Sequence, residues 1–340
     1  MGYEMSNVNG DRAITIHDVA RELGVSASTV SRAISGKGRI GEATRERVLR
    51  YIDETGFYPN AAAQSLAQAK TNNIAIILPE VKTLVDMPFF HTCMFGAEEV
   101  AQENDYDILV VTTSRRDTRP LERLILNRKV DGMILTRTYE NDYFAQFLKE
   151  KKIPFVTVGQ LDDKDIIQVD SDNKGACKAL MNKLFEKDIQ NIAYLGGNMQ
   201  QTVNRCRYEG YLEAYRQYGR KDVEDLTFLD LEDEEMIDAV VDKVLKCNPD
   251  CILCQDDFIC DEVIRRLDKQ GVRIPEDIKI ASCHYSTILD KYPASITSLN
   301  FDIMKLGRKA CQLLLDTIND MEVPMKTLLD YEILMKDSTN

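Results

Sequence analysis

Apolar positions recur with a helical spacing near the start of the chain and in short continuous runs after it. Between residues 15 and 57 they fall three or four residues apart, as in Ile16, Val19 and Ala20, which predicts amphipathic helices. From residue 73 onward, short apolar runs alternate with amphipathic helical stretches. This alternation indicates parallel sheets covered by helices on both faces. We therefore expect a small helical region followed by a larger α/β region.

Polar residues and glycines mark where the first and third of the early helices begin and end. Thr15 is a natural N-cap of the first helix, Asp18 completes an acidic variant of the capping box, and Gly24 ends this helix. A third helix is expected over about 42–55, before Gly56. Its predicted inward residues are Val48, Tyr51 and Ile52.

The second helix, which Ser26 caps, carries small and polar residues on its outer face. Its predicted core face is formed by Val30, Ala33 and Ile34. Packing alone does not require hydroxyl groups and an arginine together on the opposite face. A helix that presents such groups beyond a glycine turn fits the major groove of DNA. The outward residues are Ala27, Ser28, Thr29, Ser31 and Arg32.

This region resembles the DNA-binding headpiece of the lac-repressor (LacI/GalR) family of transcription factors. The matching segments are Thr15-Ile16-x-Asp18-Val19-Ala20, Gly24-Val25-Ser26-x-x-Thr29-Val30-Ser31-Arg32, Thr44-Arg45-x-Arg47-Val48 and Tyr58-Pro59-Asn60. The resemblance implies an all-α helix-turn-helix headpiece over 14–58. Before it, we expect a disordered leader over 1–13. The resemblance also implies that bases are contacted by Ala27, Ser28 and Arg32, and that further DNA contacts come from Thr15, Ser26, Thr29 and Ser31.

An alanine-rich segment follows the headpiece and favours a helix, although it is too short to be stable alone in water. In the resembling family this segment is the hinge helix, which folds when two copies meet in the minor groove. A plain helical linker is the alternative. The resemblance implies a hinge and linker over 59–72, phosphate contact by Asn60, a further DNA contact by Ala63, and a wedge between base steps by Leu66.

Apolar runs in the larger region predict strands at 74–79, 107–113, 131–136, 153–159, 192–197, 251–254 and 278–283. Helices between them include 89–104, 173–186 and 205–218. The region is too long for one doubly wound sheet, so we expect two subdomains, crossed more than once by the chain. Ligands of such sheets bind beyond the carboxyl ends of the strands, which places a binding cleft between the subdomains. The tail after residue 328 has the pattern of one last strand.

The resemblance continues over 73–335, where it implies a periplasmic-binding-protein-like core that binds an effector and forms a homodimer. Arg207 offers a planar fork of donors, and Asp256 can accept hydrogen bonds from neighbouring hydroxyls. Phe89 and Phe90 can stack against a sugar ring, and Gln160 directly follows a strand. The alternatives are an interdomain ion pair for Arg207 and core packing for at least one of the two phenylalanines.

One position of the expected cleft departs from the family. His284 stands where the family often has an acidic residue. If it lines the cleft, an anionic acceptor for a sugar is lost and a pH-sensitive group is gained. A partly buried histidine satisfied by the backbone is the alternative. Asp257 is interpreted as a helix cap. The expected effector residues are therefore Phe89, Phe90, Gln160, Arg207, Asp256 and His284.

The charge distribution agrees with a DNA-binding head on an acidic body. The net charge is −13, but residues 12–50 hold eight Lys and Arg against four Asp and Glu, a balance of +4 that leaves −17 elsewhere. No apolar signal core or run of the ~20 residues needed to span a bilayer is present. The nine cysteines lack metal-ligand spacing apart from Cys251-x-x-Cys254. We expect a cytoplasmic protein with reduced thiols and neither a metal nor a cofactor.

The sequence contains no G-x-S-x-G motif and no P-loop, and it has only three histidines, so we do not expect an enzyme. We expect a homodimeric transcriptional regulator, first of all a repressor, that binds a pseudo-palindromic operator in double-stranded DNA. A small molecule in the cleft, with a sugar as the first candidate, should control its affinity with either sign. The tail lacks a heptad extension, which favours a dimer over a tetramer. The alternatives are a solute-binding protein of the same core fold, and a regulator controlled by a partner protein or a non-sugar effector such as a nucleobase.

Overall fold

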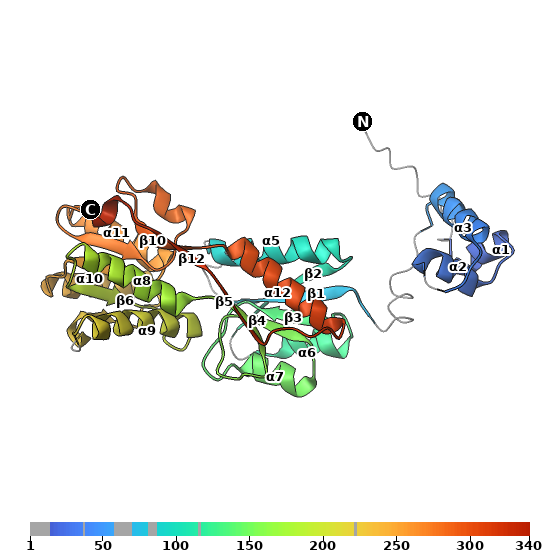
Figure 1. Ribbon diagram of the computed structural model, residues 1–340, viewed down its shortest axis with the longest axis horizontal. Coiled ribbons are helices and arrows are strands. Elements are labelled where there is room, and N and C mark those ends of the chain that lie inside the picture. The colour runs from blue at the N-terminus through green and yellow to red at the C-terminus, as the bar shows by residue number, and fades with distance from the viewer. Residues whose placement is uncertain (1–13, 37, 58–69, 81–86, 115–116, 221–222) are drawn as a thin grey trace. The chain divides into compact units, whose positions relative to one another are not determined.

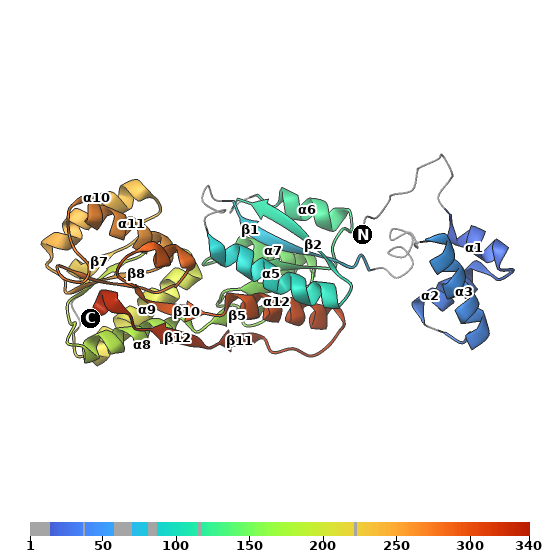
Figure 2. The same ribbon diagram turned by 90° about the horizontal axis from the view of Figure 1, so that it is seen from above.

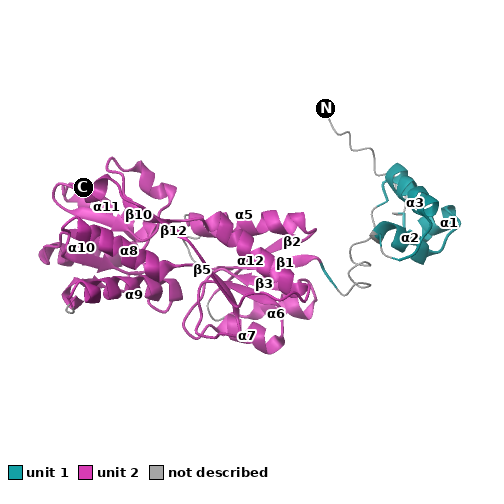
Figure 3. Ribbon diagram, in the orientation of Figure 1, with its two compact units in different colours: residues 1–71 teal, residues 72–340 magenta. Residues whose placement is uncertain are grey.

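The computed structural model describes residues 14–36, 38–57, 70–80, 87–114, 117–220 and 223–340. The chain divides into two compact units, residues 1–71 and residues 72–340 (Figure 3). The DNA contacts expected of Asn60, Ala63 and Leu66 lie outside the described residues. Across the described ranges, no helix combines the length and the apolar character that a bilayer crossing requires.

The first unit contains three helices around one small core. They are α1 (Ile16–Glu22), α2 (Ala27–Ser35) and α3 (Glu42–Thr55), and α3 has the predicted bounds. The capping box is present, since the Asp18 amide donates to the Thr15 hydroxyl oxygen over 3.3 Å and the Thr15 backbone amide donates to the Asp18 carboxylate over 3.0 Å. Arg47 donates to the carbonyl of Leu23 over 2.7 Å and so satisfies the end of α1. The core consists of Val19, Ala20, Val30, Ala33, Val48 and Phe57.

The second unit consists of two lobes, each built on a six-stranded sheet (Figures 1 and 2). The strand order of the first lobe is β11-β5-β4-β3-β1-β2. Its strands are β1 (Asn73–Pro79), β2 (Asp107–Thr113), β3 (Gly132–Leu135), β4 (Phe155–Val158), β5 (Ile167–Ser171) and β11 (Lys326–Leu329). Its helices are α5 (Pro88–Glu103), α6 (Arg119–Leu126), α7 (Tyr143–Lys151) and α12 (Ile303–Ile318).

The second lobe repeats this architecture with the order β12-β10-β9-β8-β6-β7. Its strands are β6 (Ile192–Leu195), β7 (Thr227–Phe228), β8 (Cys251–Cys254), β9 (Lys279–Ser282), β10 (Thr297–Phe301) and β12 (Tyr331–Leu334). Its helices are α8 (Asn173–Glu186), α9 (Thr202–Gln217), α10 (Glu234–Lys246) and α11 (Asp257–Lys269), with short 3-10 turns at Glu224–Leu226, Thr287–Lys291 and Asp337–Thr339.

Alternate residues of each central strand pack against opposite helical layers. In β1, Ile74 and Ile76 belong to the cluster under α5 and α12, whereas Ala75 and Ile77 belong to the cluster under α6 and α7. The second lobe does the same with α8 and α9 on one face and α10 and α11 on the other. Burial of both faces explains why these strands appear in the sequence as continuous apolar runs.

The chain crosses between the lobes three times within the described residues. The crossings join β5 to α8, β10 to α12, and β11 to β12. The sequence pattern predicted one last strand in the tail, and this prediction is wrong. Asp330 separates two short strands, of which β11 runs parallel to β5 in the first lobe and β12 runs antiparallel to β10 in the second. The prediction of repeated crossings is confirmed.

Candidate functional site

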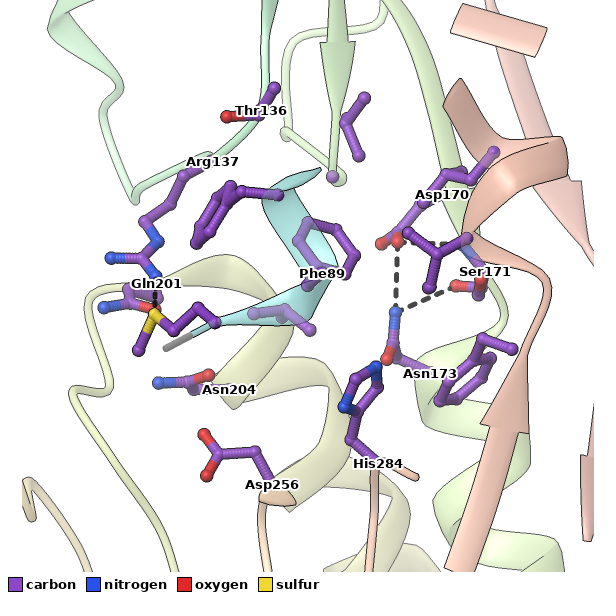
Figure 4. A pocket seen from close by; sticks show the side chains of 18 of the residues that line it. Phe89, Thr136, Arg137, Asp170, Ser171, Asn173, Gln201, Asn204, Asp256 and His284 are labelled. Carbon is purple, nitrogen blue, oxygen red and sulfur yellow. Dashed lines mark hydrogen bonds between the residues drawn. The ribbon is translucent and has the colours of Figure 1, made fainter. Parts of the chain in front are cut away.

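A cavity of about 920 Å³, part of it open to solvent, lies between the two lobes (Figure 4). Five of the six predicted effector residues line it: Phe89, Phe90, Arg207, Asp256 and His284. Gln160 does not line it. Its amide nitrogen donates to Asp170 over 3.3 Å, and its oxygen accepts a hydrogen bond from Lys326 over 2.6 Å. Sequence reasoning missed the polar lining residues Thr136, Arg137, Thr138, Asp170, Ser171, Asn173, Gln201 and Asn204.

Arg207 is buried in a hydrogen-bond network at the floor of this cavity. Its Nε donates to the Asn173 side-chain oxygen and its Nη1 to the carbonyl of Gln255, both over 2.9 Å. Its guanidinium lies 5.8 Å from the ring centre of Phe301. Asn173 in turn donates to Asp170 over 3.0 Å (Figure 4). Arg207 therefore takes part in a polar network within and beside the cavity, and these contacts differ from the interdomain ion pair that was the alternative.

Asp170 is the penultimate residue of β5, just before the first crossing between the lobes, and is only 6% exposed. Burial raises the pKa of its carboxyl group from 3.8 to about 6, against the opposing effects of the Ser171 amide and the Gln160 side chain. A carboxyl group in such an environment can accept a hydrogen bond from a ligand hydroxyl. Its position at the carboxyl end of a parallel strand is the signal that could have identified it from sequence.

Two adjacent acids at the start of α11 have roles different from those expected. Asp256, not Asp257, is the N-cap, since its carboxylate accepts from the Ile259 amide over 2.9 Å. Burial and the neighbouring charge of Asp257 raise the pKa of Asp256. Burial also acts to raise the pKa of Asp257, but its hydrogen bond to His284 and the histidine charge outweigh this effect and lower it to about 2. The interpretation of Asp257 as a cap was wrong because the helix begins at Asp257 itself, one residue earlier than a cap at Asp257 requires.

His284 is 6% exposed and stands in the wall of the cavity. Its Nδ1 lies 3.1 Å from a carboxylate oxygen of Asp257, whereas its Nε2 has no hydrogen-bond partner. The imidazole lies nearly parallel to the ring of Phe301, with centres 6.2 Å apart, and meets Phe89 edge-on at 6.3 Å. The partner of Nδ1 is therefore a carboxylate, not the backbone.

The two neighbouring phenylalanines have different environments. Phe90 is 3% exposed and packs in the core of the first lobe, while Phe89 is partly buried at its edge. Their rings meet at 89° with centres 5.3 Å apart. The guanidinium of Arg137 lies 5.0 Å from the centre of the Phe90 ring. Of this pair, Phe90 thus packs in the core and Phe89 is the more exposed, which agrees with the expectation that one of the two packs in the core.

A set of contacts joins the two lobes at one side of the cavity. The hydroxyls of Thr138 and Thr202 share a hydrogen bond, and the Thr202 amide donates to the carbonyl of Thr138 over 3.2 Å. The Glu140 amide donates to the carbonyl of Gln200 over 2.8 Å, and its carboxylate pairs with Arg205 at 3.1 Å. We call these five residues the interlobe clasp.

The outer face of α2 carries most of the residues expected to contact DNA. Ser28, Ser31 and Arg32 are exposed, Thr29 is half-buried, and Ala27 packs partly against the headpiece core. The Ser26 hydroxyl caps α2 and lies 2.8 Å from the hydroxyls of both Ser28 and Thr29. Thr15 is half-buried, with its hydroxyl bound to Asp18. Ser28, Ser31 and Arg32 are therefore accessible to a groove, and Ala27 offers less surface than expected.

Comparisons with known proteins match almost the whole chain. A family model described as "Bacterial regulatory proteins, lacI family" matches residues 15–60, and one described as "Periplasmic binding proteins and sugar binding domain of LacI family" matches residues 71–335. The transcriptional regulator MalR of Streptococcus pneumoniae is 28% identical over 333 residues, which cover 95% of this chain and 99% of MalR. CelR of Thermobifida fusca is 28% identical over 336 residues, covering 96% of this chain and 98% of CelR.

Two solved structures extend these similarities. The complex of the transcriptional regulator CelR with cellobiose matches with a TM-score of 0.72 at 27% identity, over 96% of this chain and 99% of that chain. The lac repressor dimer bound to operator and an anti-inducer matches with a TM-score of 0.81 at 18% identity, again over 96% and 99%. The lac repressor match shows that the fold is shared.

Proposed function

Since the chain belongs to the lacI family of bacterial regulatory proteins, we propose that it is a homodimeric repressor whose operator affinity is controlled by a sugar in the interlobe cavity. Membership of the family makes it a DNA-binding transcriptional regulator, and the regulators that it resembles are not enzymes. We expect it to act in the cytoplasm, where the DNA of a bacterium lies. The observation that carries the proposal is the cavity, in which polar side chains meet an aromatic wall.

The lining of the cavity suits a polyhydroxylated ligand. Arg207, Asn173 and Asp170 form a polar floor, while Phe89 and Phe301 offer ring faces and edges to the apolar side of a sugar. The relative CelR has been solved with cellobiose. These two facts favour a sugar over a nucleobase or a control by a partner protein alone.

The headpiece supports the DNA-binding part of the proposal. Ser28, Ser31 and Arg32 are exposed on α2, and Arg32 can bind the edge of a guanine with two hydrogen bonds. A dimer presents two such helices, so its operator should be a pseudo-palindrome with half-sites one helical turn or a multiple of it apart. Exposed hydroxyls of the same helix would set its position on the phosphates.

The first lobe offers an apolar surface for a second copy. Phe95 on α5 is 54% exposed and Val110 on β2 is 52% exposed. β2 is an edge strand of its sheet, since it pairs with β1 on one side and with no described strand on the other. Large exposed apolar side chains beside a sheet edge are typical of an interface. We expect a dimer in solution.

Closure of the two lobes couples the cavity to the DNA. A sugar that contacts both lobes binds the closed form better than the open form and therefore shifts the population toward it. The operator also binds one of the two forms better, so the sugar raises or lowers the affinity of the protein for the operator. By linkage, the operator changes the affinity of the protein for the sugar by the same factor. The interlobe clasp and the three crossings are the parts that would differ between the two forms.

The DNA-binding part is tested by selecting operators from a random pool with the full chain and measuring affinity at two salt concentrations. Neutralisation of phosphates by the headpiece predicts a steep loss of affinity with salt. A weak, salt-insensitive interaction would reject the regulator. Light scattering at twice the chain mass would support the dimer, and any other mass would contradict it.

The effector is tested by a thermal-shift screen with glucose, maltose, cellobiose, sugar phosphates and nucleobases. A ligand that binds only the folded protein raises the midpoint by mass action. We expect a neutral sugar to raise it and to change operator affinity. A midpoint raised only by a nucleobase, or by none of these compounds, would contradict the sugar.

A further inference from the structure

Of the fully buried polar side-chain atoms that line the cavity, within the described residues, Nε2 of His284 is the one with no hydrogen-bond partner. A buried acceptor or donor left unpaired costs about 1–3 kcal/mol. The cavity wall therefore contains a polar atom that a ligand can satisfy. This inference rests on the proposed sugar-binding function and concerns which sugar group meets that atom.

The hydrogen on the other ring nitrogen is fixed by Asp257. Nδ1 lies 3.1 Å from a carboxylate oxygen of Asp257, and an ionised carboxylate can only accept a hydrogen bond. Nδ1 must therefore carry a hydrogen. In a neutral imidazole the second nitrogen then has a lone pair and no hydrogen, so Nε2 is an acceptor.

Aromatic neighbours hold the imidazole in this orientation. Phe301 lies nearly parallel to it, at an angle of 15°, and Phe89 meets it at 70° from the cavity side. The ring is only 6% exposed, so rotation about its χ angles would displace packed neighbours. Figure 4 shows His284 in the wall between Asn173 and Asp256. The lone pair of Nε2 is therefore held in a fixed place.

The surrounding charges favour an uncharged ligand. Three carboxyl groups, those of Asp170, Asp256 and Asp257, line the cavity with the guanidinium groups of Arg137 and Arg207. Arg207 already donates through Nε and Nη1 to protein oxygens. A phosphate ester would thus face three acids with much of one guanidinium already engaged. A hydroxyl group meets no such repulsion.

We propose that His284 is a specificity-determining residue that accepts a hydrogen bond from a sugar hydroxyl through Nε2. Asp257 is the positioning residue that keeps the hydrogen on Nδ1. The cavity accordingly selects an uncharged sugar that offers a hydroxyl hydrogen at this point, and rejects an analogue that offers only an acceptor there.

The tautomer can be tested without any ligand. The chain has only three histidines, so ¹⁵N-histidine spectra of the full-length protein are simple, and His284→Asn assigns the signal of interest. In spectra recorded at about pH 7.5, the proposal requires an Nδ1 that carries a hydrogen and an Nε2 that does not. Asp257→Asn should remove this preference. A hydrogen on Nε2 of the wild-type protein, in the neutral or the doubly protonated ring, would overturn the proposal whether or not a sugar binds.

The acceptor role is tested by calorimetry with maltose and cellobiose and their monodeoxyfluoro analogues. Fluorine is close in size to a hydroxyl but cannot donate. At one ring position the fluoro analogue should bind the wild-type protein roughly tenfold more weakly, about the worth of one hydrogen bond. His284→Phe keeps a ring without an acceptor and should bind both forms of that sugar equally, and His91→Phe, on α5 outside the cavity lining, should behave as the wild type.

Each result separates this proposal from the proposed function. Equal binding of every fluoro analogue to the wild-type protein overturns the role of His284 while leaving sugar control intact. Tighter binding of glucose 6-phosphate than of glucose overturns the preference for an uncharged ligand. If neither disaccharide binds, the sugar effector fails, and the ¹⁵N spectra still decide the state of His284. If His284→Phe does not fold, Asp257→Asn takes its place, and its discrimination between hydroxyl and fluorine should shrink.

Discussion

Arg205 of α9 forms an ion pair with Glu140 of the first lobe, with the two side chains 3.1 Å apart. A backbone hydrogen bond from Glu140 to Gln200 lies beside it, so the pair is part of a contact that exists only when the lobes are close. Arg205 is also 4.0 Å from Asp162. Ion pairs this exposed contribute at most about 1 kcal/mol, which is enough to bias an equilibrium between two forms without locking it.

Glu140→Gln should loosen the interlobe clasp. We expect faster amide hydrogen exchange at Glu140 and Thr202, whose amide hydrogens bond across the lobes, and up to about a fivefold change in sugar affinity. Glu186→Gln removes an exposed pair with Lys183 inside one lobe and serves as the control. Unchanged exchange at both amides in Glu140→Gln would mean that the ion pair does not hold the lobes together.

Arg32 should provide base selectivity. Arg32→Ala should weaken specific operator binding by about 1–3 kcal/mol and relax the choice at one base pair. Arg32→Lys keeps the charge but loses the planar fork, so it should restore binding to phosphate without restoring that choice. Anisotropy titrations with single-base variants of a selected operator measure both effects. Full selectivity in Arg32→Lys would show that Arg32 contacts the DNA phosphate backbone and not the bases.

Arg207 should be needed both for the sugar response and for the stability of the second unit. A lysine cannot donate to Asn173 and to the Gln255 carbonyl in the same geometry, so Arg207→Lys should lower the free energy of unfolding by about 1–3 kcal/mol. The variant should still bind operator but no longer respond to sugar. Arg216→Lys, an exposed change in the same helix, is the control for urea unfolding and operator binding. A normal sugar response in Arg207→Lys would place the ligand elsewhere.

Asp170 should make the stability of the protein depend on pH in an identifiable window. Its pKa is raised from 3.8 to about 6 in the folded protein, so its contribution to stability is present below 3.8 and is lost as the pH rises to about 6. Asp170→Asn has no such loss. Its stability relative to the wild type should therefore rise by on the order of 2–3 kcal/mol from about pH 4 to about pH 7.5.

Urea unfolding across that range measures this difference for Asp170→Asn. Asp268→Asn, an exposed change in α11, should give a difference that does not vary with pH. A flat profile for Asp170→Asn as well would show that Asp170 is not buried in its acidic form.

The sequence was sufficient for the elements that bury apolar residues with a regular period. The bounds of α3 and the seven predicted strands follow from such periods, because both faces of the central strands are covered. β5 and β10 were missed, since they carry polar residues such as Asp170 and Asn300 where the chain passes from one lobe to the other. The split tail was missed because the single residue Asp330 leaves no visible break in an otherwise strand-like run.

The candidate site was predictable as far as single residues carry a recognisable chemistry. Arg207, Phe89 and His284 were identified in this way and line one cavity. Which partner each side chain takes could not be predicted, because it depends on contacts between segments far apart in the chain. The pairing of His284 with Asp257 spans 27 residues, and that of Gln160 with Lys326 spans 166.

The three crossings between the lobes have a mechanical consequence. One tether would let two rigid bodies swing and twist independently, and every further tether removes some of that freedom. With three, bending about the line of crossings is the simplest movement left, so opening and closing follow a single path. Sugars of different size would then stabilise different degrees of lobe closure along this one path. Gene control would be graded by the degree of closure that each sugar allows.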